Sequence, residues 1–225
     1  MTEEKNRNRA LADRAVEMAG LKKGSRILDI GCGEGDTVAY LRDELGMDAE
    51  GIDTNLAKIS AGKEKYPGIP IRYGDGEFLD EYMSFTFDGI LIEGALSRTN
   101  MPDEALHEAW CVMKKGGRIM IADVYEKDPD PKQMRAVEIE ADRLSRIQRK
   151  EGDCEDRGMK FVAFRHEDAF YKDPLIREME SIGFEILGFE DRTKEAKGLW
   201  TEEETKTGRG KKKLGYFLLA AAKPL

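Results

Sequence analysis

The sequence lacks several features that would assign it to common protein classes. No apolar run approaches the roughly 18 consecutive apolar residues that a membrane-spanning helix requires, so no membrane partner is expected. The first residues, Met1 to Arg9, are charged and polar and contain no apolar signal core. Cysteine is scarce: Cys32, Cys111 and Cys154 lie far apart and none is in Cys-x-x-Cys spacing. This usage indicates a reducing compartment, predicts a cytoplasmic protein and offers no metal site.

Positive charge is also in deficit. The chain has 37 lysines and arginines against 45 aspartates and glutamates, a net charge of −8. Because duplex affinity comes largely from phosphate neutralisation, nucleic acid is not the expected partner. The length of 225 residues suits one large α/β domain. We expect a single domain over residues 1–225, with an N-terminal helix in 1–22, an insert or lid in 123–172 and a long basic loop in 191–213.

Helical and strand patterns alternate along the first half of the chain, which is typical of a parallel sheet with crossover helices. The expected strands are Ile27–Ile30, a short strand ending at Asp53, Ile69–Tyr73, Phe87–Ile92, Arg118–Ala122, Phe184–Glu190 and Leu214–Ala222. The expected helices lie near residues 4–20, 36–45, 56–65, 102–113, 132–150 and 173–182. The insert between the fifth and sixth strands is too long for a simple crossover, so we expect it to cover part of the molecule.

One segment carries the strongest local signal. Residues 26–35 read Arg-Ile-Leu-Asp-Ile-Gly-Cys-Gly-Glu-Gly, an apolar strand that runs into a glycine-dense turn before a helix. Backbone N–H groups at such a turn can contact the polar end of a cofactor, because few side chains block their approach. Asp53 ends the next strand about twenty residues later, where a ribose would present its hydroxyls. The segment therefore predicts a nucleoside-containing cofactor.

A dinucleotide is the first alternative. Dinucleotide sites favour Gly-x-Gly-x-x-Gly, whereas here the glycines are Gly31, Gly33 and Gly35, and the third place after Gly33 is Asp36. A carboxylate at this helix N-terminus would repel a pyrophosphate, but it would attract a cofactor that carries an amino group and a sulfonium cation. Electrostatics therefore favours a cationic cofactor over NAD.

Five ordered motifs resemble those of the class I S-adenosylmethionine-dependent methyltransferases. They are Arg26–Gly35, Gly51–Asp53, Gly74–Glu77, Phe87–Glu93 and Val112–Arg118, the last with Lys115 where the family usually has proline. The likeness covers roughly residues 23–122 and 173–223. It implies a Rossmann-like, doubly wound, seven-stranded and mainly parallel sheet of order 3-2-1-4-5-7-6 with the last strand antiparallel, and an inserted helical lid. It also implies methyl transfer from S-adenosylmethionine, with S-adenosylhomocysteine as product.

The resemblance implies roles for particular residues. The implied cofactor-binding set is Asp29, Gly31, Cys32, Gly33, Asp53, Thr54, Asp75, Gly76 and Glu93. In the family pattern Asp29 would help to hold the methionine amino group, and Asp53 would accept two hydrogen bonds from the ribose. Asp75 and the Gly76 N–H would meet the adenine, although Asp75 also fits a plain turn-capping role. The Cys32 side chain itself is expected to be a small packing group.

No sequence pattern identifies a catalytic residue, which therefore stays unknown at this point. His166, in the insert, is a candidate general base because histidine titrates near neutrality, but a surface or packing role is the simpler interpretation. Glu93, Asp123 and Tyr125 follow strand ends and are further candidates. The main hypothesis is a methyltransferase that acts on a small-molecule acceptor. The alternatives are a non-catalytic S-adenosylmethionine-binding or interaction protein, and an RNA or protein methyltransferase that uses the basic loop.

Overall fold

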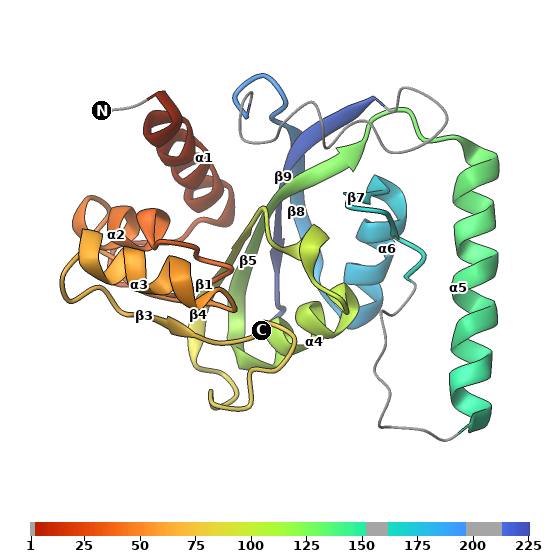
Figure 1. Ribbon diagram of the computed structural model, residues 1–225, viewed down its shortest axis with the longest axis horizontal. Helices are drawn as coiled ribbons and strands as arrows, with labels where there is room; N and C mark the ends of the chain where they lie inside the picture. Colours follow the sequence, from red (N-terminus) through yellow and green to blue (C-terminus); the bar gives the residue numbers. More distant parts are fainter. Residues whose placement is uncertain (1–2, 152–161, 197–212) are drawn as a thin grey trace.

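A central sheet with helices on both faces forms the body of the protein (Figure 1). The structure, a computed structural model, describes residues 3–151, 162–196 and 213–225. Its helices are α1 (Glu3–Ala19), α2 (Asp36–Asp43), α3 (Leu56–Lys65), the 3₁₀ helix η1 (Leu96–Arg98), α4 (Pro102–Val112), α5 (Pro131–Glu151) and α6 (Lys172–Ile182). Its strands are β1 (Arg26–Ile30), β2 (Asp48–Asp53), β3 (Ile71–Tyr73), β4 (Phe87–Glu93), β5 (Met113–Glu126), β6 (Arg165–His166), β7 (Ala169–Phe170), β8 (Glu185–Asp191) and β9 (Leu214–Ala222).

The seven longer strands lie in the order β3-β2-β1-β4-β5-β9-β8. All pair in parallel except β9, which runs antiparallel to both of its neighbours. Counted along the chain without the two short strands, this is the predicted order 3-2-1-4-5-7-6 with an antiparallel last strand, so the predicted fold is confirmed. The short strands β6 and β7 form a hairpin that joins the sheet through Tyr125 and Phe170, which brings the described sheet to nine strands.

Strand register brings the motif residues to one edge of the sheet. Ile30, the last residue of β1, pairs with Ile52 of β2 and with Ile92 of β4. The residues that follow these three lie at the same carboxyl edge of the sheet, namely Gly31, Asp53 and Glu93. In open α/β sheets this edge is where ligands bind, so the fold itself gathers the candidate site.

Two apolar clusters fill the space between the sheet and its helices. One packs α1, α2 and α3 on one face, through residues such as Leu11, Val38 and Ile59. The other packs α4 and α6 on the opposite face, through residues such as Leu106 and Leu175. The central parallel strands are buried on both faces, as parallel sheets covered by crossover helices require. These clusters hold the carboxyl edge of the sheet in a fixed geometry.

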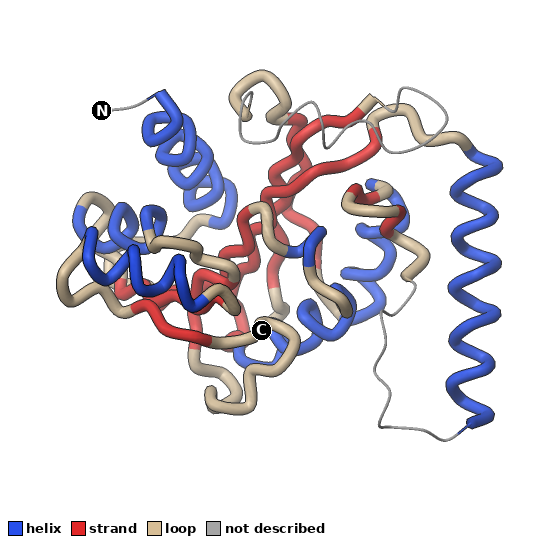
Figure 2. Tube along the Cα trace, viewed as in Figure 1, coloured by secondary structure: helices blue, strands red, loops and turns tan. Residues whose placement is uncertain are grey.

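The insert contains a short hairpin in addition to the helix expected near residues 132–150. This β6–β7 hairpin includes Phe170 and is preceded by Phe164, and both side chains are buried in the core. The helix α5 stands at the side of the body, on the opposite side of the molecule from α2 and α3 (Figure 2). One contact with α6 is the ion pair between Glu138 and Arg177, at 3.6 Å. The role of the insert as a lid stays a prediction.

Some sequence-based expectations fall on undescribed parts of the chain. Cys154 and most of the predicted basic loop, residues 197–212, lie outside the described residues. At the margin of that loop, Lys213 forms an ion pair with Asp128 at 2.9 Å. Among the helices that the structure describes, none combines the length and apolar character needed to cross a bilayer.

Candidate functional site

The turn between β1 and α2 brings bare backbone to the carboxyl edge. Its three glycines have positive φ values of 80°, 55° and 81°, at Gly31, Gly33 and Gly35. At Gly31 a Cβ atom would lie 2.3 Å from the Cβ of Ala95, so only glycine fits at this close approach. The turn is tied to β2 because the Gly31 N–H donates to the carbonyl oxygen of Ile52 at 2.8 Å. The predicted side-chain-poor turn is therefore present next to the end of β2.

Asp53 fixes this turn directly. Its Oδ2 accepts a hydrogen bond from the Gly33 N–H at 2.8 Å, and its Oδ1 accepts one from the Asn55 N–H at 2.7 Å. A carboxylate offers about four lone-pair sites, so two further donors can still be accommodated. Thr54, the next residue, is exposed. Backbone N–H groups thus fix the Asp53 carboxylate, which can still accept hydrogen bonds from a ligand.

Three carboxyl groups surround the turn; Asp29, Asp53 and Glu93 are called the acidic cluster below. Asp29 is only 2% exposed, and its pKa is raised well above the usual range, first by burial and then by the charges of Glu93 and Asp53. Burial also raises the pKa of Glu93 to about 7, opposed by a hydrogen bond from the Thr37 hydroxyl at 3.3 Å. Such a cluster favours a cationic ligand, because buried charges need compensation.

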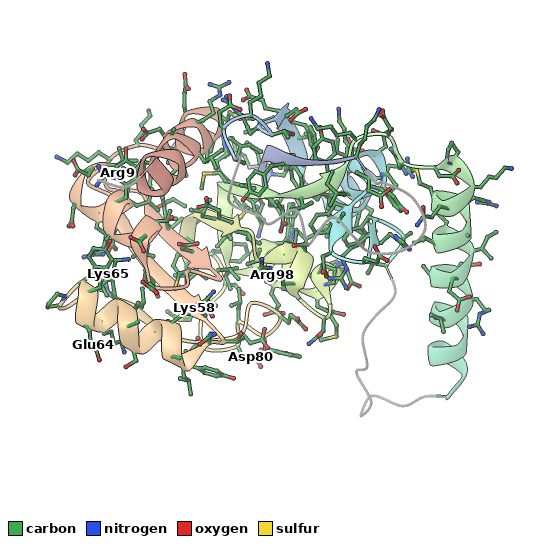
Figure 3. All side chains as sticks on the ribbon, turned by 45° about the horizontal axis from the view of Figure 1, so that its top comes forward. Arg9, Lys58, Glu64, Lys65, Asp80 and Arg98 are labelled. Atoms are coloured by element: carbon green, nitrogen blue, oxygen red, sulfur yellow. The ribbon has the colours of Figure 1, made fainter. Side chains whose placement is uncertain are left out.

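Asp36 does not belong to this cluster, which corrects the charge argument made from the sequence. Its carboxylate accepts hydrogen bonds from Lys65 Nζ at 2.8 Å and from the Tyr66 hydroxyl at 2.6 Å. Lys65 lies at the far end of α3, labelled in Figure 3. The negative charge of Asp36 is therefore paired with a lysine, and the preference for a cation rests on the acidic cluster instead.

The loop after β3 forms a tight turn beside β1. The Asp75 carboxylate accepts from the Glu77 N–H at 3.0 Å, and its carbonyl accepts from the Phe78 N–H at 3.0 Å. A Cβ atom at Gly76 would lie 2.4 Å from Cγ2 of Ile30, so the Gly76 backbone sits directly against the end of β1. The turn-capping role considered for Asp75 is present in the structure.

Cys32 is buried in the turn. A Cβ atom at Gly51 would lie 2.8 Å from the Cys32 Sγ, so the thiol fills the space above β2. Burial, with the charges of Asp29 and Asp53, raises the pKa of the thiol. A protonated, buried thiol is a poor nucleophile. The Cys32 side chain packs, and only its backbone lies in the turn.

A second polar group lies next to the acidic cluster, inside β5 and one residue past Ala122, the partner of Glu93. Asp123 is 1% exposed and accepts hydrogen bonds from the Ser97 N–H at 2.9 Å and the Val124 N–H at 2.8 Å. Tyr216 of β9 donates its hydroxyl to the carbonyl oxygen of Ala122 at 3.1 Å, and its pKa is raised by burial, Glu93 and Asp123. The sequence had marked Tyr216 only as part of a strand, because the contact spans 94 residues.

His166 lies away from these groups. Its Nδ1 is 3.0 Å from Gln133 Nε2 and 3.8 Å from Glu126 Oε1, and its ring stacks on Tyr171. Glu126 lies four residues past Ala122, the residue that pairs with Glu93. At about 3.3 Å per strand residue, this separates the His166 contacts from the acidic cluster by about 13 Å along β5. The structure does not bring this candidate base together with the other predicted site residues.

Two cations flank the carboxyl edge. Lys58 on α3 approaches the turn, since a Cβ atom at Gly33 would lie 3.9 Å from its Cδ. Arg98 on η1 opposes, through its positive charge, the rise in the pKa of Asp123. Both are labelled in the central part of Figure 3, whereas Glu64 is labelled toward the outer end of α3.

Comparison with known proteins identifies relatives of this chain. A family model described as a methyltransferase domain matches residues 21–171. The chain is 32% identical over 108 residues to demethylmenaquinone methyltransferase of Renibacterium salmoninarum, covering 48% of this chain and 45% of the relative. It is 27% identical over 215 residues to phosphoethanolamine N-methyltransferase 3 of Arabidopsis thaliana, covering 90% and 44%. The chain spans about half the length of the curated relatives it matches.

Solved structures share the fold at low sequence identity. The crystal structure of the [4+2]-cyclase SpnF superposes with a TM-score of 0.68 at 20% identity, covering 96% of this chain and 82% of that chain. Geranyl diphosphate C-methyltransferase from Streptomyces coelicolor A3(2), in complex with Mg²⁺, geranyl diphosphate and S-adenosyl-L-homocysteine, gives 0.66 at 15% identity, covering 95% and 78%. These likenesses concern the fold alone. With the family match over residues 21–171 and the confirmed strand order, the chain belongs to the class I S-adenosylmethionine-dependent methyltransferase family.

Proposed function

We propose that this protein transfers a methyl group from S-adenosylmethionine to a small-molecule acceptor by in-line displacement. The observation that carries the proposal is the buried Asp29 carboxyl beneath the glycine turn, crowded by Glu93 and Asp53. A ligand with an ammonium group and a sulfonium would relieve the repulsion within this cluster, whereas a pyrophosphate would add to it. S-adenosylmethionine carries both cations, and its sulfonium makes the methyl group electrophilic.

Each part of the cofactor has a residue of suitable chemistry in the site. Asp29 would hold the methionine amino group, beneath the backbone of Gly31 to Gly33. Asp53 has acceptor capacity left for the two ribose hydroxyls, a charge-assisted contact. The Asp75–Gly76 turn offers a carboxylate and an N–H for the adenine. These assignments extend the family pattern to the positions that match it.

The chemistry asks the protein chiefly for positioning. Positive charge is lost from sulfur as the methyl group leaves, so no new anion has to be stabilised there. Alignment of acceptor, carbon and sulfur can supply much of the acceleration. A base is needed only where the acceptor must lose a proton. Glu93, whose pKa is raised to about 7 at the same edge of the sheet, is the group we propose for that role.

Binding tests the cofactor assignment. Isothermal titration with S-adenosylmethionine, S-adenosylhomocysteine and NAD should show binding of the first two. Asp53→Asn should weaken nucleoside binding about tenfold or more, since hydrogen bonds to charged groups are strong. Glu64→Gln is the matched control, because it removes an exposed carboxylate on the outer part of α3. Binding of NAD alone, or equal affinities for wild type and D53N, contradicts the assignment.

A non-catalytic role is the second candidate, and the position of His166 favours it. About 13 Å of β5 separates the contacts of that histidine from the acidic cluster, so His166 is not at hand there as a base. Labelled methyl transfer should therefore be assayed with demethylmenaquinone and phosphoethanolamine, the acceptors named by the relatives, and with RNA. Transfer to a small molecule supports the main proposal. Tight cofactor binding without transfer supports the second candidate, and transfer to RNA alone supports the basic-loop alternative.

A further inference from the structure

The segment after β4 links the cofactor side of the site to the insert. We call residues 94–100, which include η1, the β4 loop. Its first residue, Gly94, donates its N–H to the carbonyl oxygen of Ala122, so the loop starts in contact with β5. From there it passes the glycine turn, where Ala95 lies against Gly31. The β4 loop therefore forms a wall next to the place proposed for the transferred methyl group.

Two buried carboxylates hold the amides of this loop from different elements. Asp123, within β5, accepts from the Ser97 N–H at 2.9 Å. Glu77 accepts from the Asn100 N–H at 2.6 Å and is 6% exposed. Glu77 directly follows the Asp75–Gly76 turn, and its own N–H donates to the Asp75 carboxylate. The loop is thus connected on one side to the proposed adenine contact.

Arg165 holds the carbonyl groups of the same loop from the insert. Its Nη1 donates to the carbonyl oxygens of Ser97 at 3.1 Å and Thr99 at 2.5 Å, and its Nη2 to that of Asn100 at 3.5 Å. Carbonyl groups at the end of a helical turn have no partners within it, and a cation is favourable there. The planar guanidinium, with five N–H donors in a fixed geometry, suits several such acceptors at once. Arg165 therefore caps η1 from a position 67 residues later in the chain.

The backbone of Arg165 is itself fixed to the core. Arg165 pairs with Phe170 in the β6–β7 hairpin, and Phe170 pairs with Tyr125 of β5. Phe164 and Phe170 are 2% and 0% exposed. Burial lowers the pKa of Arg165, and nearby acids oppose this effect, namely Asp168, Glu77, Asp103 and Asp123. The guanidinium is thus a half-buried cation on a rigid support, surrounded by acceptors.

We propose that Arg165 is a positioning residue, which braces the β4 loop against the insert so that cofactor binding and the geometry of the acceptor side are coupled. The proposal rests on the proposed cofactor site. An adenosyl group bound at the Asp75–Gly76 turn would restrain Glu77. Through its hydrogen bond from the Asn100 N–H, Glu77 would in turn restrain Asn100. Arg165 joins the carbonyls of Asn100 and Ser97, so the effect reaches the segment that contacts Asp123. On this basis the insert acts as a fixed brace for the acceptor wall.

Amide hydrogen exchange resolved to single residues tests the brace. Wild-type protein and Arg165→Gln are compared with and without S-adenosylhomocysteine. In the ligand-free state, the Ser97 and Asn100 amides should exchange about tenfold or more faster in R165Q, because their segment loses its charge-assisted hydrogen bonds. S-adenosylhomocysteine should slow these two amides in wild type and slow them less in R165Q. Amides of β1 should be unaffected by the substitution in both states.

Arg177→Gln is the matched control. It removes another arginine that pairs with the insert, through Glu138. Among the described residues Arg177 forms no hydrogen bond or ion pair with the β4 loop, so this substitution should leave Ser97 and Asn100 unchanged. If R165Q fails to fold, Arg165→Lys replaces it, since lysine keeps the charge but cannot span the same carbonyls. Unchanged exchange at both amides in a folded variant that still binds S-adenosylhomocysteine overturns the brace and leaves the proposed function intact. Absence of S-adenosylhomocysteine binding to wild type overturns the proposed function, and the coupling with it.

Discussion

Replacing Glu93 by glutamine tests the charge balance of the acidic cluster in the ligand-free protein. Burial raises the pKa of Glu93 from its usual 4.5 to about 7, and the hydrogen bond from Thr37 partly opposes this rise. Glutamine has nearly the same size and can still accept that hydrogen bond, but it cannot ionise. The substitution therefore removes the charge with little change in packing.

The sign of the effect follows from proton binding. The folded carboxyl binds its proton more tightly than the unfolded one, so its contribution to stability is complete below about pH 4.5 and is lost as the pH rises through about 7. A rise of about 2.5 in pKa, at about 1.36 kcal/mol for each unit, corresponds to at most about 3 kcal/mol. The charge of Glu93 also raises the pKa of Asp29. Removing that charge lowers the pKa of Asp29 and so also favours the stability of E93Q at the higher pH.

Urea unfolding at about pH 5 and about pH 8, followed by tryptophan fluorescence, gives the two free energies of unfolding. We expect E93Q to gain stability relative to wild type on going to the higher pH, by roughly 2–3 kcal/mol. The pH dependence of groups that do not interact with Glu93 is common to both proteins and cancels in the difference. The exposed Glu64→Gln serves as the control and should show no such gain. Parallel loss of stability in wild type and E93Q would refute the reasoning.

Three further predictions concern the turn, the opposite edge of the sheet and ligand binding. Gly31→Ala should lower the free energy of unfolding by about 2–5 kcal/mol in urea titrations, because alanine is strained at this φ and its Cβ meets that of Ala95. Lys223→Met should lower it by about 1–3 kcal/mol, since Lys223 Nζ donates to the carbonyl oxygens of Trp110 and Met113; S-adenosylhomocysteine binding should be unchanged. The affinity for S-adenosylmethionine, measured calorimetrically, should rise by up to about tenfold per pH unit up to about pH 7 and then level off, because a cation in the acidic cluster expels the proton that Glu93 holds below that pH. S-adenosylhomocysteine, which has no sulfonium, should show a shallower slope.

Local signals predicted much of the fold. The helix α3 was expected from Leu56 to Lys65 and has these bounds, because Asn55 caps its start and Pro67 follows its end. The fifth strand was expected only from Arg118 to Ala122, but β5 runs from Met113 to Glu126. Its extension past Ala122 depends on pairing with β9, as far as Glu126 with Leu214, whereas Met113 at its start pairs with Phe87 of β4. Contacts across so many residues leave no local pattern.

The same distinction applies to the site. The glycine turn and Asp53 were predicted because their positions are set by one strand–turn–helix unit and the strand next to it. The brace by Arg165 was missed because it joins two segments 65 to 68 residues apart. The pairing of Asp36 with Lys65 was missed for the same reason, and it reversed the interpretation of that carboxylate. Charge at a motif position can be assigned only when its partners in space are known.

A crystal structure of the complex with S-adenosylhomocysteine tests the central claim most directly. We expect the methionine amino group at Asp29, the ribose hydroxyls on the carboxylate of Asp53 and the adenine beside Gly76. A nucleoside bound at another edge of the sheet, or an Asp53 carboxylate turned away from the sugar, would contradict it.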